Sequence, residues 1–368
     1  MLQKRSRSYN KLMDRYIGVM SGTSLDGVDV VLCEIDSVTC KIICAQEFSF
    51  ESELQKDILD AIANPVTLER VGVLHVRLGA MYAKHINTFL KQHNIDKKTV
   101  TAIGLHGQTL WHAPNNPHPF SMQLGDASVV ATRVGIPVAY DFRSKDIANG
   151  GQGAPLAPAF HKFLFGTLGD VAVVNIGGMA NITLLGKEFL GWDSGCGNVL
   201  LDYWIQKTQQ KPYDTDGVFA QSGKVDNTLL HKMLDDPYFA KKPPKSTGRE
   251  HFNAKWLEDM LVGFEHLNSA DVQATLTELT AKTITKDIPQ SEQIILCGGG
   301  AKNSYLIKRI AAHTTAKITS SKAYGVDADF LEAMMIAWLA SMRIKEKDIN
   351  LQGITGARKN SILGSLIL

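Results

Sequence analysis

Apolar residues near the start of the chain predict three successive strands. The runs YIGVM (16–20), VDVVLCEI (28–35) and KIICAQEFSF (41–50) are rich in β-branched and aromatic residues, which favour extended backbone. The first two runs flank a polar stretch at 21–29, although a hairpin needs only two turn residues. Its glycines let a ligand approach the backbone, and its hydroxyl and N–H groups suit phosphate oxygens. A solvated turn explains this stretch equally well.

A helical pattern comes next, and it leads into a further strand. Residues 68–95 carry apolar side chains three to five positions apart, which predicts an amphipathic helix. The run VTAIGLHGQT (100–109) predicts a buried strand that ends in a glycine-containing turn. His106 in this turn is a candidate ligand contact, although a histidine whose hydrogen bonds are satisfied at a strand end is the commoner outcome.

The middle of the chain repeats the pattern of its beginning. VAVVNIGGMANITLLG (171–186) again consists of a strand, a glycine-rich turn and a strand. Two such hairpins indicate two related α/β halves, each contributing one phosphate-facing turn to a shared cleft. The similarity is short, so chance resemblance between two hairpins is the alternative.

The last third predicts another glycine-rich strand exit between helices. A helix at 272–288 precedes QIILCGGGAKN (293–303), a buried strand that opens onto three glycines and a helix from about Asn303. Ligands of α/β sheets bind at the carboxyl ends of strands, where such turns lie. The helix predicted at 329–344 is apolar on more than one side and should be well buried.

Composition narrows the class of protein. With 368 residues the chain is long enough for two domains, and its 44% apolar and 21% charged residues are typical of a globular protein. A net charge of +2 gives no basis for nucleic-acid binding. Apolar stretches are too short or too polar to span a membrane, and the basic first 15 residues predict a flexible tail rather than a signal peptide. The five cysteines form no CxxC pair, which favours a reducing, cytoplasmic location.

Asp193 is the strongest candidate for catalysis. The chain has no GxxxxGK[ST], GxGxxG or HExxH motif, so a nucleotide site must be built from the two hairpins and the Gly298 turn. Asp193 comes after an apolar strand in GWDSGCGNVLLD and suits a general base or a metal contact. Alternatively it caps the next helix, but Asn198 is available for that, so we favour the functional interpretation.

Two further charged residues have competing interpretations. Arg143 stands between Asp141 and Asp146 in DFRSKDIANGGQGAPLAPAFH. Its guanidinium could hold a carboxylate or a phosphate, or it could pair with either neighbour, and the spacing does not separate these. Asp329 and Glu332 have the spacing of a helix capping box, and without other information that interpretation of Glu332 is preferred.

Together these motifs resemble one family. The chain is similar to 1,6-anhydro-N-acetylmuramic acid kinases, within the superfamily of actin, sugar kinases and heat-shock chaperones, from about Tyr16 to the C-terminus. The resemblance rests on the order and number of these motifs: MSGTSLDGVD, LHGQT, QLGD, DFRSKDIANGGQGAPL, NIGGMANIT, GWDSGCGN, PPKSTGREHF, QATLTELTA, CGGGAKN and ITGARKNSILG.

The resemblance implies a fold and an assembly. We expect an α/β protein of two related actin/sugar-kinase-like ATPase domains around a central cleft. Domain I would comprise 16–168 and 330–368, domain II would comprise 169–329, and residues 1–15 would form the tail. The family further implies a cytoplasmic homodimer with small-molecule substrates, without nucleic-acid or membrane partners.

The resemblance also implies roles for single residues. ATP with Mg²⁺ would be the cofactor, and no protein ligand of the metal is assigned. The first phosphate loop would comprise Gly22, Thr23, Ser24, Leu25, Asp26, Gly27, Val28 and Asp29. The second would contain Gly177, Gly178 and Asn181, and the turn facing adenosine would contain Gly298, Gly299, Gly300 and Asn303. Asp193 would be the catalytic base, and the sugar contacts would be Arg143, Glu332 and His106. Ser194 and Cys196 depart from the family's usual threonine and proline, which affects the loop that carries the base.

The implied reaction combines hydrolysis with phosphoryl transfer. Water attacks the anomeric carbon of 1,6-anhydro-N-acetylmuramic acid, the internal ether opens, and the freed O6 takes the γ-phosphoryl group of ATP. The products are N-acetylmuramic acid 6-phosphate and ADP, a step in peptidoglycan recycling. Two alternatives stay open: a plain sugar kinase, whose base deprotonates a substrate hydroxyl, and an ATP-switched protein without enzymatic activity.

Overall fold

The chain folds into two compact units. The computed structural model describes residues 13–368 except 23, 24, 26, 244, 289 and 290. Unit 1 comprises Met1–Lys145, Ala333–Asp348 and Ile362–Leu368, and unit 2 comprises Asp146–Glu332 and Ile349–Ser361. The expected basic tail lies outside the described residues up to residue 12.

Unit 1 contains a six-stranded sheet and a small hairpin. The strand order of the sheet is β13-β7-β4-β1-β2-β3. β1, β2 and β3 form an antiparallel meander, whereas β4 pairs in parallel with both β1 and β7. The sheet strands are β1 (Asp14–Ser21), β2 (Gly27–Ile35), β3 (Cys40–Ser49), β4 (Ala102–Leu105), β7 (Val138–Tyr140) and β13 (Ser365–Ile367). β5 (Gln108–Ala113) and β6 (Phe120–Leu124) form a separate hairpin.

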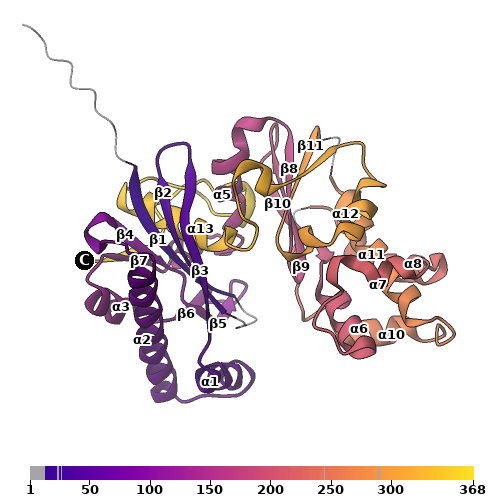
Figure 1. Ribbon diagram of the computed structural model, residues 1–368, viewed down its shortest axis with the longest axis horizontal. Coiled ribbons are helices and arrows are strands. Elements are labelled where there is room, and N and C mark those ends of the chain that lie inside the picture. The colour runs from indigo at the N-terminus through magenta and orange to yellow at the C-terminus, as the bar shows by residue number, and fades with distance from the viewer. Residues whose placement is uncertain (1–12, 23–24, 26, 244, 289–290) are drawn as a thin grey trace, which may run out of the picture. The chain divides into compact units, whose positions relative to one another are not determined.

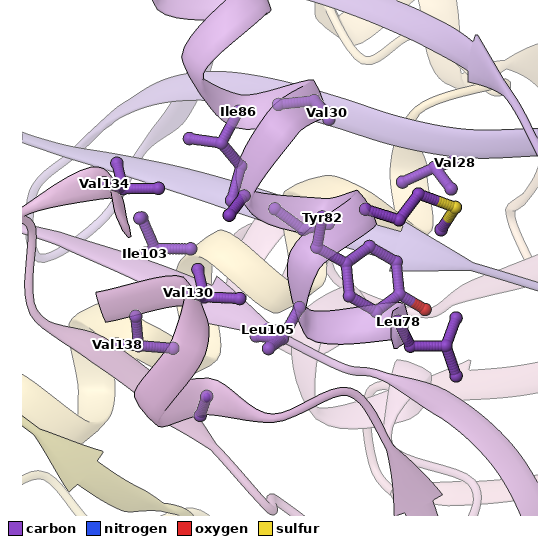
Figure 2. Packing of buried hydrophobic residues seen from close by; sticks show 14 of the residues in the cluster. Val28, Val30, Leu78, Tyr82, Ile86, Ile103, Leu105, Val130, Val134 and Val138 are labelled. Carbon is purple, nitrogen blue, oxygen red and sulfur yellow. The ribbon is translucent and has the colours of Figure 1, made fainter. Parts of the chain in front are cut away.

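Helices cover both faces of this sheet. α2 (Leu68–Gln92) begins where Thr67 Oγ1 accepts a hydrogen bond from the backbone N–H of Arg70. α2 and α3 (Ala127–Val134) pack with α1 (Ser52–Ala63) over one face. Figure 2 shows the core between them and the sheet: Val28, Val30, Leu78, Tyr82, Ile86, Ile103, Leu105, Val130, Val134 and Val138. These side chains are almost completely buried, which confirms the predicted amphipathic helix and strands.

The opposite face of the sheet packs against α13 (Leu331–Ile344) at unusually short distance. Gly18 on β1 and Gly104 on β4 have no side chain between their backbone and the helix. A Cβ atom at Gly18 would collide with the carbonyl oxygen of Ala333, and one at Gly104 with that of Ile336. Residues 333–341 are buried on all sides, as the apolar pattern predicts.

Unit 2 repeats the sheet of unit 1. Its strand order is β10-β9-β8-β11-β12, with an antiparallel meander from β8 to β10 and parallel pairing of β11 with β8 and β12. The strands are β8 (Val171–Ile176), β9 (Met179–Leu185), β10 (Leu190–Cys196), β11 (Gln293–Cys297) and β12 (Lys317–Ser320). In both sheets the first three strands form a meander, and the fourth and fifth extend the sheet in parallel. The expectation of two related α/β halves is therefore confirmed, while the cleft stays a prediction.

Helices of unit 2 cover its sheet and form an additional lobe. α11 (Ser269–Lys286) and α12 (Ser304–Ala311) pack on one face, and α5 (Ala157–Phe165) and α14 (Gln352–Thr355) contact the other. The remaining helices gather around a second core that includes Cys196 and Phe252 (Figure 1). They are α6 (Val199–Gln209), α7 (Val218–Ser222), α8 (Asn227–Leu234), α9 (Pro237–Ala240) and α10 (Ala254–Leu261).

The division of the chain differs from the expected domain boundaries in three segments. Residues 146–168, 330–332 and 349–361 belong to unit 2. Contacts explain this for the two longer segments: Thr355 Oγ1 donates to Asp146 Oδ1 (2.9 Å), and the ring of His161 on α5 bonds Thr183 Oγ1 on β9 (2.9 Å). α4 (Ser144–Ala148) begins in unit 1 and ends in unit 2.

Candidate active site

The turn between β1 and β2 is attached to the core of unit 1 at Leu25. The backbone N–H of Leu25 donates to the carbonyl of Gly22 (3.2 Å), and Gln55 Nε2 donates to the carbonyl of Leu25 (2.8 Å). Leu25 has φ of +58°, a left-handed conformation that leucine seldom adopts, and its side chain is completely buried. Gly27, Val28 and Asp29 start β2. Thr23, Ser24 and Asp26 lie outside the described residues, and the phosphate-binding role of this turn stays a prediction.

The second glycine turn, Gly177–Gly178, is hydrogen-bonded to the turn after β10. The backbone N–H groups of Gly197 and Val199 donate to the carbonyl of Gly178, at 2.9 and 3.1 Å. That of Asn198 donates to the carbonyl of Gly177 (2.8 Å). The ends of β8 and β10 are thus fixed against each other, which places the predicted phosphate turn beside the end of β10, the strand that carries Asp193.

The third glycine turn comes after β11. Gly298 has φ of +78°, and a Cβ atom there would collide with the side chain of Asn175. Gly299–Lys302 form a short 3₁₀ helix, and Asn303 caps α12 by accepting a hydrogen bond from the backbone N–H of Leu306 (2.9 Å). Asn303 therefore has a structural role beside its predicted contact with adenosine.

A cavity of about 570 Å³ in unit 2 brings the Gly298 turn together with residues that sequence reasoning missed. Its lining includes three predicted residues, Gly299, Gly300 and Asn303. The lining residues that were not predicted are Asn198, Leu201, Asp202, Tyr213, Asp214, Thr215, Asp216 and Lys302. Burial raises the pKa of Asp202 to about 6, although the charge of Arg249 opposes this. Asn198, Leu201 and Asp202 stand in GWDSGCGNVLLD and Lys302 in CGGGAKN, whereas residues 213–216 belong to no motif quoted above.

Asp193 lies on β10 with both carboxylate oxygens hydrogen-bonded. Oδ1 accepts from Asn181 Nδ2 on β9, its partner in the antiparallel register. Oδ2 accepts from Ser246 Oγ (2.9 Å) and from the backbone N–H of Thr247 (3.0 Å). A β-bulge lies between Asp193 and Gly195. These contacts run to β9 and to residues 246–247 and not to the helix that follows, and the catalytic role of Asp193 stays a prediction.

The environment of Asp193 suits proton transfer. Burial is the largest influence on its carboxyl group and raises the pKa above the usual range of aspartate. The three hydrogen-bond donors act in the opposite direction because they favour the charged form, whereas the charge of Glu250 adds to the increase. A carboxylate with a raised pKa is a stronger base, and the donors fix its orientation.

The two residues that depart from the family pattern are buried beside Asp193. Ser194 Oγ donates to the carbonyl of Ala180 (3.2 Å), which ties β10 to β9. Burial raises the pKa of the Cys196 thiol to about 12, so this thiol is neutral and packs in the core of the helical lobe. Both side chains thus serve packing.

In unit 1 the structure brings Arg143 and His106 together. Arg143 Nη2 lies 2.8 Å from His106 Nε2, and His106 Nδ1 lies 2.7 Å from the carbonyl oxygen of Gly107. Burial, aided by the charge of Arg143, lowers the pKa of His106 to about 3. The neutral ring donates from Nδ1 and accepts at Nε2, which orients the guanidinium.

His106 also lines a cavity of about 360 Å³ within unit 1. The rest of the wall comes from α2, the β5–β6 hairpin and the ends of β4 and β7, and it includes His75, Phe120, Met122, Gln123, Tyr140 and Asp141. Polar and aromatic side chains are therefore combined in one recess, as is common in sites for small polar ligands.

Glu332, the third predicted sugar contact, lies in the first turn of α13. Its charge adds to the effect of burial that raises the pKa of Cys297. Asp329, its partner in the capping-box interpretation, forms an ion pair with Lys302 (2.6 Å). The sugar-binding role of Glu332 stays a prediction.

Metal clusters and membrane spans are both absent from the part of the chain that the structure describes. These residues contain no group of three or more His, Cys, Asp or Glu side chains arranged to hold a metal ion. Among the same residues, no helix combines the length and the apolar character that crossing a bilayer requires.

Comparison with known proteins identifies the family. The family model described as anhydro-N-acetylmuramic acid kinase matches residues 14–368. A curated relative with that name from Sulfurimonas denitrificans is 50% identical over 95% of this chain and 98% of its own. Another relative of that name, from a Sulfurovum species, is 51% identical over 96% of this chain and 99% of its own. A solved structure, the activator of 2-hydroxyisocaproyl-CoA dehydratase from Clostridium difficile with bound ADPNP, is 12% identical with a TM-score of 0.46, over 90% of this chain and 96% of that chain. The chain belongs to the anhydro-N-acetylmuramic acid kinase family.

Proposed function

We propose that Asp193 is the general base of an ATP-dependent reaction that opens the 1,6-anhydro ring of 1,6-anhydro-N-acetylmuramic acid and phosphorylates O6. Membership of the family indicates the activity, that of an ATP-dependent anhydro-N-acetylmuramic acid kinase. The family acts in peptidoglycan recycling. The observation that carries the assignment of the base is the buried carboxylate of Asp193, held by Asn181, Ser246 and Thr247.

One carboxylate is sufficient for this chemistry. Inverting glycosidases open a glycosidic bond with two carboxyl groups, of which one activates water and the other protonates the leaving oxygen. Here Asp193 would take a proton from the attacking water, which forms the bond to C1 as the bond from C1 to O6 breaks. The electron pair left on O6 would attack the γ-phosphorus of ATP, and ADP would leave. The phosphoryl group thus accepts the leaving oxygen, and no second acid is needed.

We propose that ATP occupies the cavity of unit 2, with adenosine near Gly299, Gly300 and Asn303. A volume of about 570 Å³ suits a nucleoside. The triphosphate would extend toward the Gly177–Gly178 turn, where backbone groups can approach it closely. Bound Mg²⁺ would neutralise phosphate charge during the transfer.

The sugar contacts are also proposals. Arg143 would bind the carboxylate of the muramic acid moiety, because its guanidinium is already oriented by His106. Glu332 would accept a hydrogen bond from a sugar hydroxyl. We further propose a cytoplasmic homodimer, which rests on the family resemblance.

Mass spectrometry of the sugar product tests the reaction. After incubation with ATP and Mg²⁺, the anhydro-sugar should gain the mass of one water and one phosphoryl group, and ¹⁸O from labelled water should appear at C1 in rapidly quenched samples. A plain sugar kinase would add the phosphoryl group alone. Absence of any phosphorylated sugar, with ATP bound, would contradict the proposal and favour a non-enzymatic ATP-switched protein.

A further inference from the structure

We propose that the segment Lys245–Thr247 is a positioning device for Asp193, in which Ser246 and Thr247 hold one carboxylate oxygen and Lys245 anchors the segment. This inference rests on the proposed role of Asp193 as the base. Ser246 and Thr247 lie 53 and 54 residues beyond Asp193 in the chain. The tertiary fold therefore brings this segment to the base.

The segment contacts Asp193 through both the backbone and the side chain. The backbone N–H of Asp193 donates to the carbonyl of Lys245 (2.9 Å). Directly after Lys245, Ser246 and Thr247 both donate to Oδ2, at 2.9 and 3.0 Å. The segment thus holds both the backbone N–H and one carboxylate oxygen of the same residue.

A buried ion pair anchors this segment. Lys245 Nζ lies 2.7 Å from Asp287 Oδ2, just beyond the C-terminus of α11, and only 3% of the Lys245 side chain is exposed. Removing a lysine from water is costly unless it is paired, so the chain has a strong preference for this one position of Lys245. The position of Ser246 and Thr247 is set by it through the short connecting backbone.

Tyr238 contacts both Asp193 and Lys245. Its hydroxyl donates to the backbone carbonyl of Asp193 (2.7 Å), and Lys245 Nζ lies 5.2 Å from the centre of its ring. Both backbone polar groups of Asp193 are therefore bonded, the N–H to Lys245 and the carbonyl to Tyr238. Asn181 in turn donates to Oδ1, so both carboxylate oxygens and both backbone polar groups of Asp193 are hydrogen-bonded.

The segment also tunes the charge of the base. Hydrogen bonds from Ser246 and Thr247 favour the ionised carboxylate and partly offset its burial. The charged or titratable groups facing Asp193 are Glu250, which raises its pKa, and Tyr238, whose own pKa Asp193 raises. The Lys245 charge is directed to Asp287. Losing one donor should therefore raise the pKa of Asp193.

Ser246→Ala tests the inference because Ser246 contributes a single side-chain hydroxyl, and its replacement should leave the fold intact. We expect kcat to fall about 10- to 100-fold, the loss typical for one hydrogen bond to a charged group, with KM for ATP and sugar unchanged. The base must be ionised, so activity is lost as pH falls through its pKa. A higher pKa moves the acidic limb of the kcat profile to higher pH. Ser246→Thr, which keeps the hydroxyl, should restore both.

The matched control is Ser222→Ala. Ser222 is an exposed serine of unit 2 whose hydroxyl donates to the carbonyl of Phe219, away from Asp193. It should leave kcat and the pH profile unchanged. Wild-type kcat and an unmoved acidic limb in Ser246→Ala would overturn the inference. If Asp193→Asn also stays fully active, the proposed base itself is wrong, so the two failures are distinguishable.

Discussion

The two units share one strand order but differ in the segments that their strands lead into. In unit 2, the turns after β8, β10 and β11 are all rich in glycine, and hydrogen bonds join the first two. In unit 1, the turn after β1 is attached to the core by Leu25, and β4 ends at the paired His106 and Arg143. A common sheet thus places strand ends in equivalent positions, and the residues beyond those ends decide the chemistry. We expect unit 2 to carry the base, Glu332 and most of the nucleotide contacts, and unit 1 to contribute the predicted first phosphate turn and the sugar contacts Arg143 and His106.

The largest effect should come from unit 2, through Asp193→Asn. The amide keeps the size and much of the hydrogen bonding but removes the base, so turnover should fall by roughly 10²–10⁴-fold. Ring opening and phosphoryl transfer should fall together, because O6 becomes free only as the ether breaks. Steady-state kinetics and product analysis measure both. Normal ring opening with loss of phosphoryl transfer alone would place Asp193 on the nucleotide side of the reaction.

Arg143→Ala examines the contribution of unit 1 and should act on binding. Loss of a charge-assisted contact with the sugar carboxylate should raise KM for the sugar roughly 10–100-fold. The KM for ATP should stay the same. Arg133→Ala, which removes an exposed arginine at the end of α3, serves as the control. An unchanged KM for the sugar in Arg143→Ala would contradict the proposed role of Arg143 in sugar binding.

Substitutions at two glycines of unit 2 should distinguish an effect on nucleotide binding from an effect on stability. A Cβ atom at Gly178 would meet no atom closer than Arg249 Nη2 at 3.6 Å, whereas one at Gly197 would collide with the carbonyl oxygen of Gly177. Gly178→Ala should therefore keep the Tm but weaken binding of a non-hydrolysable ATP analogue about tenfold, a loss of about 1.4 kcal/mol. Gly197→Ala should lower stability by roughly 1–3 kcal/mol.

Calorimetry of both variants measures these effects, with titration for the affinity and scanning for the Tm. Unaltered affinity in Gly178→Ala would show that phosphate does not approach this turn. A Gly197→Ala variant as stable as the wild type would contradict the tight junction of the two turns.

The effect that is smallest at neutral pH concerns two buried histidines. Burial lowers the pKa of His161 in unit 2 to about 4, and His85 in unit 1 is lowered to about 4 as well. The unfolded chain takes up a proton near pH 6.5 while the folded chain stays neutral, so stability falls as pH drops from about 6.5 to 4. Each histidine contributes a slope of up to about 1.4 kcal/mol per pH unit.

Replacing either histidine by glutamine should flatten this dependence by a similar amount in denaturant titrations at several pH values. If the pH dependence of stability becomes weaker in only one variant, only the histidine replaced in that variant is kept neutral by the folded protein. An unchanged slope in both would show that neither ring is held neutral.

Local sequence patterns predict many of the strands and helices well. The strands around both glycine turns, α2 and the buried α13 can be predicted from the periodicity of apolar residues over short windows. Asp193 is accessible to prediction for the same reason, because its signal, a carboxylate between an apolar strand and glycines, is contiguous.

Contacts between distant residues could not be predicted in this way. Ser246 lies 53 residues from Asp193, and His106 lies 37 residues from Arg143. Their pairing depends on the tertiary fold, because the motifs that contain Ser246 and His106 do not indicate which distant side chain each residue meets. The same holds for Tyr213 and Asp216, which reach the cavity of unit 2 from an irregular segment after α6.

The close packing of α13 on Gly18 and Gly104 has a consequence for the motions of unit 1. Since helix and strands meet backbone to backbone, no flexible side chain can yield between them. The amide hydrogens of β1, β4 and α13 should therefore exchange with solvent as one cooperative block, among the slowest of the unit. A single methyl group at either glycine would act as a wedge, and it would speed exchange in all three elements at once rather than only in the strand that carries it.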